Sequence, residues 1–400
     1  MFKKKITALI ISAAVALTGV TAFGLTHLAS GTATSAKAAE TDEDDDEVRG
    51  IWLSIYDYSN KNIGLCTDDE ATFRANAKKF LTNLSNYHLN TVYMQVRSND
   101  DAAWKSKLFP AMTWISPAAK ALGDDNSTQS ASETLSFDPL QIMTEEAHAQ
   151  NIKLIAWMNP YRITSSVYLN PGASSSQTRV VKAVKEVMKY DVDGVIFDDY
   201  FYNASSKYPT SSSYGYKNIV KNKITLTIAS AAKLSSAKKC AYVDKLIARV
   251  YNRIKTANPN ATFGIAPQGN LTNDLSAGAD VKTWLSKDGY IDYLMPQLYW
   301  TDDWGKDGGT AMFTNRLTQF MDPNLDKLGK TKYAALALYR CGSEYSTDHG
   351  WINSDTNLSD EYSVLKECGC NGYSLFSAAS LYSKKTTQEL AYLNEAIENN

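Results

Sequence analysis

After position 48, apolar positions fall into two alternating patterns along the chain. Short apolar runs bounded by Gly or polar residues are typical of strands buried in a parallel sheet. Apolar residues three or four positions apart predict amphipathic helices instead. The first pattern predicts eight strands, at residues 49–54, 90–98, 152–160, within 190–202, 262–269, 291–300, 332–340 and 372–380. The second predicts helices at residues 68–87, 139–150, 179–190, 217–257 with a Ser-rich break near Leu234, and 386–398.

Eight strands that alternate with helices predict an α/β fold, a single (β/α)8 TIM barrel over residues 49–400. A doubly wound open sheet uses the same alternation and is the alternative. The barrel is favoured because no Gly-rich phosphate loop follows the first strand. Polar or aromatic residues also follow most strands, rather than one pair of strands. Long loops are predicted at residues 100–134 and 203–216, and loops of this length usually serve a function.

One stretch combines a buried strand with acidic chemistry. Residues 190–202, YDVDGVIFDDYFY, start polar, become apolar and end in two adjacent carboxylates followed by aromatics. Catalytic groups of barrel enzymes follow the carboxyl ends of strands, where Asp198 and Asp199 lie in this sequence. Side chains alternate along a strand, so Ile196, Asp198 and Tyr200 are expected to face inward, while Asp199 turns inward only where the strand ends.

Glycoside hydrolysis normally uses two carboxyl groups, one as acid and one as nucleophile or base. We predict Asp198 and Asp199 as the catalytic residues. The partner of Asp198 stays open at this stage between Asp199, Asp57, Asp302, Glu344 and an N-acetyl group of the substrate. The simpler explanation of the Asp pair is a helix cap or a salt bridge with a buried Arg.

Amides, guanidinium groups and aromatics after the other strands complete a mouth suited to a polyol. The predicted substrate-binding residues are Gln95, Arg97, Trp157, Asn159, Tyr161, Arg162, Tyr202, Gln268, Gln297, Tyr299 and Trp300. For Trp157 and Tyr299, core packing is an equally good explanation. Arg97 could instead neutralise Asp198 or Asp199 across the barrel.

The N-terminus carries the pattern of an export signal. Three Lys residues, an apolar run at 6–25 and Ala-Lys-Ala at 36–38 predict a signal peptide over residues 1–38. An uncleaved anchor is the alternative, because the run approaches the about 20 residues that span a bilayer. Residues 39–48 read as an acidic linker. We therefore expect a secreted or cell-envelope protein, with no later membrane segment.

Five cysteines follow the predicted signal peptide, at Cys66, Cys240, Cys341, Cys368 and Cys370. The odd number leaves at least one thiol unpaired or paired between molecules. A bridge from Cys341 to Cys368 or Cys370 is one alternative, and the pairing is open.

Composition further restricts the classes of ligand that the protein is expected to bind. Four Lys and no acidic residue lie in positions 1–38, so the rest of the chain carries a net charge of −6, which argues against a nucleic-acid partner. The 24 Tyr and 8 Trp provide rings that suit sugar faces. No HExxH pattern, paired His, GxSxG elbow or Walker loop occurs, so neither a metal nor a cofactor is indicated. We expect a monomer that binds a polysaccharide.

Several segments, in order, resemble the glycosyl-hydrolase-like ten family of bacterial envelope proteins. They are RGIW at 49–52, NTVYMQVR at 90–97, FDPL at 137–140, EAH at 146–148, AWMNPYR at 156–162, YDVDGVIFDDYFY at 190–202, FGIAP at 263–267 and DYLMPQLYW at 292–300. The chain departs from the family where Asn203 replaces a Pro and where residues 266–269 read APQG rather than SPFG. The family's Trp-Arg-Arg is not recognisable at 216–225.

The resemblance implies a TIM-barrel glycosidase linked to bacterial cell-wall glycan, with Asp198 and Asp199 as the family's acidic pair. We thus expect a secreted glycoside hydrolase that cleaves an envelope glycan, with peptidoglycan glycan strands as the first candidate. The alternatives are a hydrolase of an α-glucan or another exopolysaccharide, and a glycan-binding barrel without catalysis. The linkage, the stereochemical outcome and endo or exo action are not readable from the sequence.

Overall fold

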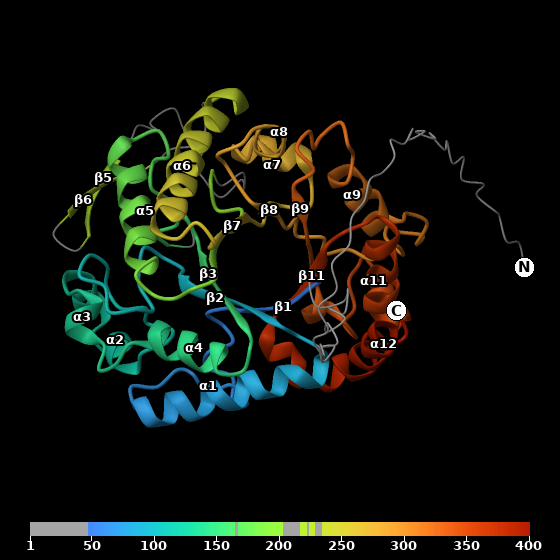
Figure 1. Ribbon diagram of the computed structural model, residues 1–400, viewed down its shortest axis with the longest axis horizontal. Helices are drawn as coiled ribbons and strands as arrows, with labels where there is room; N and C mark the ends of the chain where they lie inside the picture. Colours follow the sequence, from blue (N-terminus) through green and yellow to red (C-terminus); the bar gives the residue numbers. More distant parts are fainter. Residues whose placement is uncertain (1–46, 165–166, 203–216, 222–223, 229–233) are drawn as a thin grey trace, which may run out of the picture. The chain divides into compact units, whose positions relative to one another are not determined.

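Nine parallel strands form a ring in the computed structural model, which describes residues 47–164, 167–202, 217–221, 224–228 and 234–400 (Figure 1). The strands are β1 (Val48–Leu53), β2 (Thr91–Arg97), β3 (Lys153–Met158), β4 (Gly194–Phe197), β7 (Thr262–Ile265), β8 (Tyr293–Leu294), β9 (Thr331–Lys332), β10 (Ala334–Leu336) and β11 (Gly372–Phe376). Their order around the ring is β10-β11-β1-β2-β3-β4-β7-β8-β9. The predicted signal peptide and nearly all of the predicted linker lie outside the described residues.

The ring closes through the strand that the sequence predicts at residues 332–340. That strand is split at Tyr333 into β9, which pairs with β8, and β10, which pairs with β11. A parallel bridge between Gln297 and Ala335 joins the chain beyond β8 to β10. The nine strands are therefore the eight predicted ones with the seventh in two pieces, and the predicted TIM barrel is confirmed.

Helices surround the ring and connect successive strands (Figure 1). They are α1 (Glu70–Leu84), α2 (Pro117–Ala121), α3 (Ala131–Thr134), α4 (Pro139–His148), α5 (Ser174–Val187), α6 (Ser236–Ala257), α7 (Leu271–Ala277), α8 (Val281–Ser286), α9 (Met312–Phe320), α10 (Gly350–Asn353), α11 (Asn357–Glu367) and α12 (Thr387–Glu398). Short 3-10 turns are η2 (Ser85–Tyr87), η3 (Gly123–Thr128), η4 (Leu338–Arg340), η5 (Ala378–Tyr382) and η6 (Lys384–Thr386). Among the described residues, no helix is both long and apolar enough to cross a membrane.

Three predicted elements differ from the structure. Residues 217–221 and 224–228 form two antiparallel paired strands, β5 (Lys217–Lys221) and β6 (Ile224–Ile228), rather than helix. Residues 222–223 and 229–233 of the predicted helix lie outside the described residues. The β-branched residues in this segment favour strand over helix, and the helix begins only at Ser236, after the Ser-rich break. The predicted loop at residues 100–134 contains α2, η3 and α3. It is therefore a folded segment that leaves the barrel between β2 and β3, called the excursion below. Helix α5 also begins at Ser174, five residues before the predicted start.

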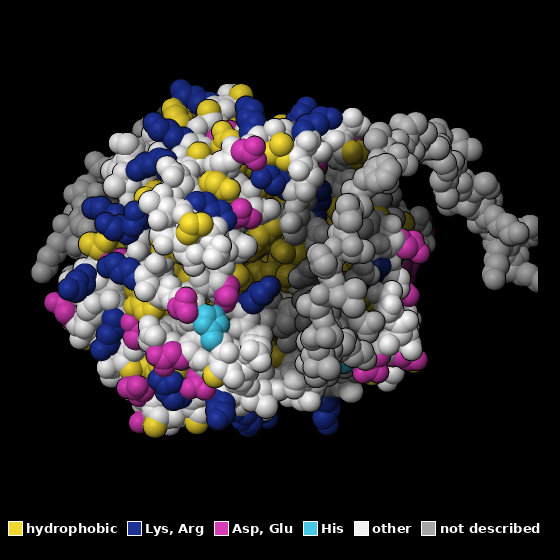
Figure 2. All heavy atoms as spheres, in the orientation of Figure 1, with side chains coloured by type: hydrophobic (Ala, Val, Ile, Leu, Met, Phe, Trp, Pro, Cys, Tyr) yellow, Lys and Arg dark blue, Asp and Glu magenta, His cyan; other side chains and the backbone are white. Residues whose placement is uncertain are grey.

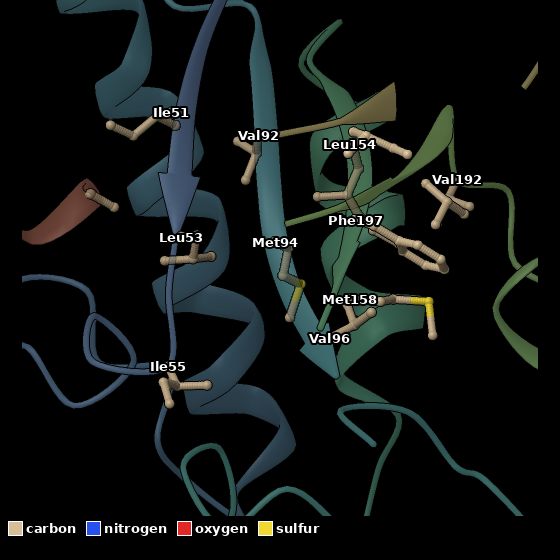
Figure 3. Close-up of a cluster of buried hydrophobic side chains, with 14 of the residues drawn as sticks. Ile51, Leu53, Ile55, Val92, Met94, Val96, Leu154, Met158, Val192 and Phe197 are labelled. Carbon is tan, nitrogen blue, oxygen red and sulfur yellow. The ribbon is translucent and has the colours of Figure 1, made fainter. Parts of the chain in front are cut away.

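Alternate residues of the strands face two separate cores. Outward-facing side chains such as Ile51, Leu53, Val92 and Met94 pack under the helices (Figure 3). Inward-facing side chains form a second cluster that fills the barrel, including Trp52, Tyr93, Trp157, Ile196 and Tyr293. Figure 2 shows hydrophobic side chains in the hollow at the centre of the ring, with basic and acidic side chains on the surface around it.

Gly264 makes room for the ring of Tyr293 inside the barrel. A Cβ at Gly264 would lie 2.1 Å from Tyr293 Cζ, closer than any real contact. The missing side chain on β7 therefore lets an aromatic residue on β8 fill the interior.

A buried ion cluster fixes the start of the long excursion after β2. Asp100 accepts hydrogen bonds from Arg97 Nη2 at 2.5 Å and from Arg179 Nε at 2.9 Å. Both Arg side chains are buried, and the guanidinium of Arg179 lies 4.5 Å from the ring centre of Phe109. One carboxylate thus pairs with two guanidinium groups, from β2 and α5, and the excursion is held against the barrel.

All five cysteines are free thiols in the structure. The alternative bridge from Cys341 is not formed, and Cys370 instead directs its thiol toward the carbonyl oxygen of Lys332 at 3.1 Å. Cys341 and Cys370 are buried and behave as small core residues.

Replacing Asp100 by Asn should lower the free energy of unfolding by about 3–5 kcal/mol, because two buried guanidinium groups would lose their shared counter-ion. Urea denaturation followed by circular dichroism measures the loss. The control is Asp288→Asn, which removes the partner of Lys330 at an exposed site and should cost no more than about 1 kcal/mol. Equal effects of the two substitutions would contradict a structural role for the buried cluster.

Candidate active site

A pocket opens at the carboxyl ends of the barrel strands. Its empty space amounts to about 560 Å³, a figure that includes the part open to solvent. Its lining residues are Trp52, Ser54, Ile55, Tyr56, Gln95, Trp157, Arg162, Asp198, Asp199, Tyr200, Gln297, Tyr299 and Phe376. These residues come from β1, β2, β3, β4, β8 and β11 or from the loops directly after them.

Aromatic side chains form the apolar wall of this pocket. Trp52 is stacked on Tyr93 with ring centres 4.9 Å apart, and its edge meets Trp157 at the same distance. The ring centre of Phe376 lies 6.3 Å from that of Trp157 and 5.9 Å from that of Tyr299. Rings packed in this way hold one another in place, so the wall has a fixed shape before a ligand arrives.

Asp198 is the more deeply buried of the two acids. It follows the last residue of β4, its exposed fraction is 3%, and its Oδ2 accepts a hydrogen bond from Trp157 Nε1 at 2.9 Å. Burial and the neighbouring charge of Asp199 raise the pKa of Asp198 well above that of an ordinary carboxyl, although the indole N–H opposes the shift. Asp198 therefore keeps its proton to a higher pH than a surface Asp.

Asp199 reaches the same pocket because β4 ends at Phe197 and the backbone leaves the strand pattern. Its Oδ1 accepts from Gln297 Nε2 at 3.2 Å. Burial raises the pKa of Asp199, while the side-chain amides of Gln297 and Gln268 stabilise its ionised form and lower it. The two acids thus differ in their partners: Asp198 meets an indole N–H, and Asp199 meets amides.

The pocket brings together seven of the thirteen predicted site residues. These are Gln95, Trp157, Arg162, Asp198, Asp199, Gln297 and Tyr299. Gln268 lies beside them, since its side chain reaches Asp199. The guanidinium of Arg162 lies 4.8 Å from the ring centre of Tyr200, next to the acids.

Arg97 and Asn159 are not part of the pocket lining. Arg97 is paired with Asp100, so neither predicted role, binding sugar or neutralising Asp198 or Asp199, agrees with its position. Asn159 is fully buried, and its Oδ1 accepts from Gln95 Nε2 at 2.9 Å. Asn159 thereby orients Gln95, which does line the pocket.

Three predicted aromatic contacts are also elsewhere. Tyr161 and Tyr202 belong to the outer hydrophobic core, with exposed fractions of 0% and 2%. Trp300 lies outside the lining, with the guanidinium of Arg316 5.8 Å from its ring centre. Each lies one or two residues away from a true lining residue or acid, so the sequence placed the region correctly but not the side chain.

The other candidates for the second carboxylate do not line the pocket. Asp57 is buried and accepts from Ser54, from Ser377 Oγ and from the backbone N–H of Ala379, so it ties the end of β1 to the end of β11. Asp302 accepts from Thr314, and Glu344 is exposed. Among the described residues, Asp198 and Asp199 are the carboxylates that line the pocket.

Sequence reasoning missed Trp52, Tyr200 and Phe376 as site residues. Trp52 and Phe376 lie within β1 and β11, and only the closed barrel shows that they face inward at the same height as Trp157. Inward alternation along strand four did point to Tyr200, but its value as a lining residue depends on the turn after Phe197.

Comparisons with known proteins identify a family for this chain and relatives of its fold. The sequence model of one family, described as glycosyl hydrolase-like 10, matches residues 47–166 and 161–351. The chain is 26% identical to the glycosyl hydrolase DigH of Escherichia coli (strain K12), over 90% of this chain and 89% of DigH. It is 27% identical to the glycosyl hydrolase YngK of Bacillus subtilis (strain 168), over 65% of this chain and 55% of YngK.

Solved structures share the fold at low identity. The α-L-fucosidase isoenzyme 2 from Paenibacillus thiaminolyticus matches with a TM-score of 0.50 and 13% identity, over 88% of this chain and 49% of that one. The exo-β-1,4-mannosidase Op5Man5 from Opitutaceae bacterium strain TAV5 matches with a TM-score of 0.50 and 10% identity, over 88% of this chain and 59% of that one. At this identity, both matches establish the barrel fold and nothing finer.

Replacing Asp198 by Asn should raise the thermal midpoint at pH 7. Because the folded-state pKa of Asp198 is raised, the folded state binds the proton more tightly than the unfolded state, and wild-type stability falls as pH rises above the unfolded value near 3.8. Asn mimics the neutral acid and removes this loss. Calorimetry at pH 7 and at pH 3.5 should show a gain that disappears at the lower pH. A variant less stable than wild type at pH 7 would contradict the raised pKa.

Proposed function

The chain belongs to the glycosyl hydrolase-like 10 family and is a glycoside hydrolase, and we propose that it cleaves glycosidic bonds in a bacterial envelope glycan. Peptidoglycan glycan strands are the proposed substrate. The observation that supports this proposal most is the pair Asp198 and Asp199, held with different hydrogen-bond partners in one aromatic-walled pocket. Two acids of unlike environment are what acid/base cleavage of a glycoside requires.

Asp198 acts as the general acid in the proposed reaction. Its raised pKa lets Asp198 keep a proton to a higher pH than an ordinary carboxyl, and that proton passes to the glycosidic oxygen as the bond from this oxygen to the anomeric carbon breaks. The leaving sugar departs as an alcohol. Ionised Asp198 then takes a proton from the water whose oxygen forms the new bond to the anomeric carbon, so the acid is restored.

Asp199 serves as the ionised partner because amides of Gln297 and Gln268 stabilise its charge. With no further carboxylate in the described lining, two roles fit Asp199. It can attack the anomeric carbon directly, or it can accept the N–H of a 2-acetamido group whose carbonyl oxygen attacks instead, as in substrate-assisted families. Wall glycan carries such acetamido groups, and the rings of Trp52, Trp157 and Phe376 offer an apolar place for the acetyl methyl.

Export is part of the proposal. The predicted signal peptide would bring the enzyme to the envelope, where wall glycan is present, and the enzyme would act there as a monomer. An α-glucan or another exopolysaccharide as substrate, and glycan binding without catalysis, are the competing possibilities. Release of reducing ends from denuded wall glycan, compared with release from α-glucan, separates these possibilities, because a binding protein would be retained on the glycan without releasing any.

Asp198→Asn should lower hydrolysis of wall glycan by at least about 100-fold, since general acid catalysis contributes roughly 10²–10⁴-fold. The matched control is Asp244→Asn, because Asp244 also accepts from an indole, Trp284 Nε1 at 2.7 Å, but lies outside the pocket. That variant should keep near-wild-type turnover. Wild-type turnover in Asp198→Asn would remove Asp198 from the mechanism.

Trp157→Phe should move the alkaline limb of the pH–rate profile to higher pH. Hydrolysis falls as Asp198 loses its proton, and the indole N–H favours that loss by stabilising the ionised form. Removing the N–H therefore raises the pKa of Asp198 further. Initial rates between pH 4 and pH 10 measure the limb, with Trp284→Phe as the control that leaves it in place. A limb that moves to lower pH would exclude Asp198 as the acid.

A further inference from the structure

An exposed pair of aromatic rings borders the acid pocket. Tyr56, in the loop after β1, lines the pocket and yet has an exposed fraction of 66%. Trp114, from the excursion at residues 100–134, has an exposed fraction of 37%, and its ring centre lies 5.4 Å from that of Tyr56 in an edge-to-face arrangement. Trp114 itself is not part of the pocket lining, so the pair continues the aromatic wall outward.

Both rings stand on fixed backbone. Next to Trp114, Ile115 is buried, and Ser116 Oγ donates to Asp68 Oδ1 at 2.6 Å. Asp68 Oδ2 accepts from the backbone N–H of Ala118 at 2.7 Å, which holds the start of α2 to the loop before α1. The turn that contains Tyr56 is closed by Asp57, whose Oδ2 accepts from the backbone N–H of Ser54 at 2.7 Å.

Large exposed aromatics on a rigid support are typical of binding surfaces, because exposure brings no stability to the free protein. Tyr339 is a third such ring near the pocket, with an exposed fraction of 39% and ring centres 5.9 Å from Tyr299 and 5.8 Å from Phe376. Exposed rings therefore adjoin the pocket lining at the ends of β1 and β10.

We propose that Trp114 and Tyr56 form an outer subsite that binds a sugar ring of the same polysaccharide chain, beyond the sugar held at Asp198 and Asp199. This inference rests on the proposed function, since the polysaccharide would extend from the acid pocket into the subsite. The apolar C–H face of a pyranose packs on aromatic rings, and Tyr56 provides continuity from the pocket to Trp114. The enzyme is thereby selective for chains over short glycosides.

Trp114→Ala should raise the KM for long glycan strands about 10-fold or more, with kcat nearly unchanged, because the subsite binds the ground state and the transition state alike. On a short aryl glycoside that occupies only the acid pocket, both constants should match wild type. Trp114→Phe keeps a ring and should restore most of the affinity for long strands. The matched control is Tyr392→Ala, whose ring has an exposed fraction of 38% on α12 and should have no effect on either substrate.

Retention on insoluble glycan tests the subsite without hydrolysis. Wild type should be retained, and Trp114→Ala should be retained several-fold less, whereas Tyr392→Ala should behave as wild type. Equal KM and equal retention for wild type and Trp114→Ala would overturn the subsite. If wild type releases no reducing ends, the proposed function fails, and the retention comparison still decides on the subsite. A wild-type protein that neither hydrolyses nor is retained overturns both proposals.

Discussion

Holding two consecutive acids in one buried pocket is the constraint on which the active site depends. In a continuing strand, Asp198 and Asp199 would point to opposite faces of the sheet. Because β4 ends at Phe197, both side chains enter the same pocket. Burying two carboxyl groups side by side is costly unless each is hydrogen-bonded, and the neighbouring strands provide those bonds: β3 through Trp157, and the segment after β8 through Gln297. The barrel thus assembles the partners from positions 41 and 98 residues away.

The sequence predicted the barrel well because its signal is repeated. Eight apolar runs in alternation with helical spacing indicate an α/β fold, and the absence of a Gly-rich phosphate loop after the first strand favoured the barrel over an open sheet. The strand pair of β5 and β6 was missed because a segment that contains several Ile and Thr residues beside a true helix has no clear period of its own. The excursion at 100–134 was recognised as long, but its short helices depend on local caps such as Ser116 and on distant contacts such as that of Ser116 with Asp68, which the sequence does not reveal.

The candidate site was predicted from the sequence less completely than the fold. Residues near the carboxyl end of a strand can be identified from the sequence, and this was sufficient for Asp198, Asp199, Gln95, Trp157 and Gln297. The sequence does not tell whether a polar residue at the end of a strand faces the pocket or a neighbouring loop. Arg97 was placed at the mouth because it ends a strand, but Asp100 three residues later captures its charge, and the left-handed backbone at Asp100 turns the loop back to allow it.

The hydrogen bonds between Asp57 and the segment after β11 have a consequence for how the chain folds. The first strand pairs with the last one, and Asp57 fastens their ends together through Ser377 and Ala379. Until residues 372–379 have been synthesised, β1 and β10 both present unpaired edges, which are prone to pair with other chains. Completion of the ring therefore depends on contacts between opposite ends of the polypeptide, which form slowly compared with local ones. Such delayed closure is compatible with the proposed export, because a chain crosses a translocation channel before it becomes compact.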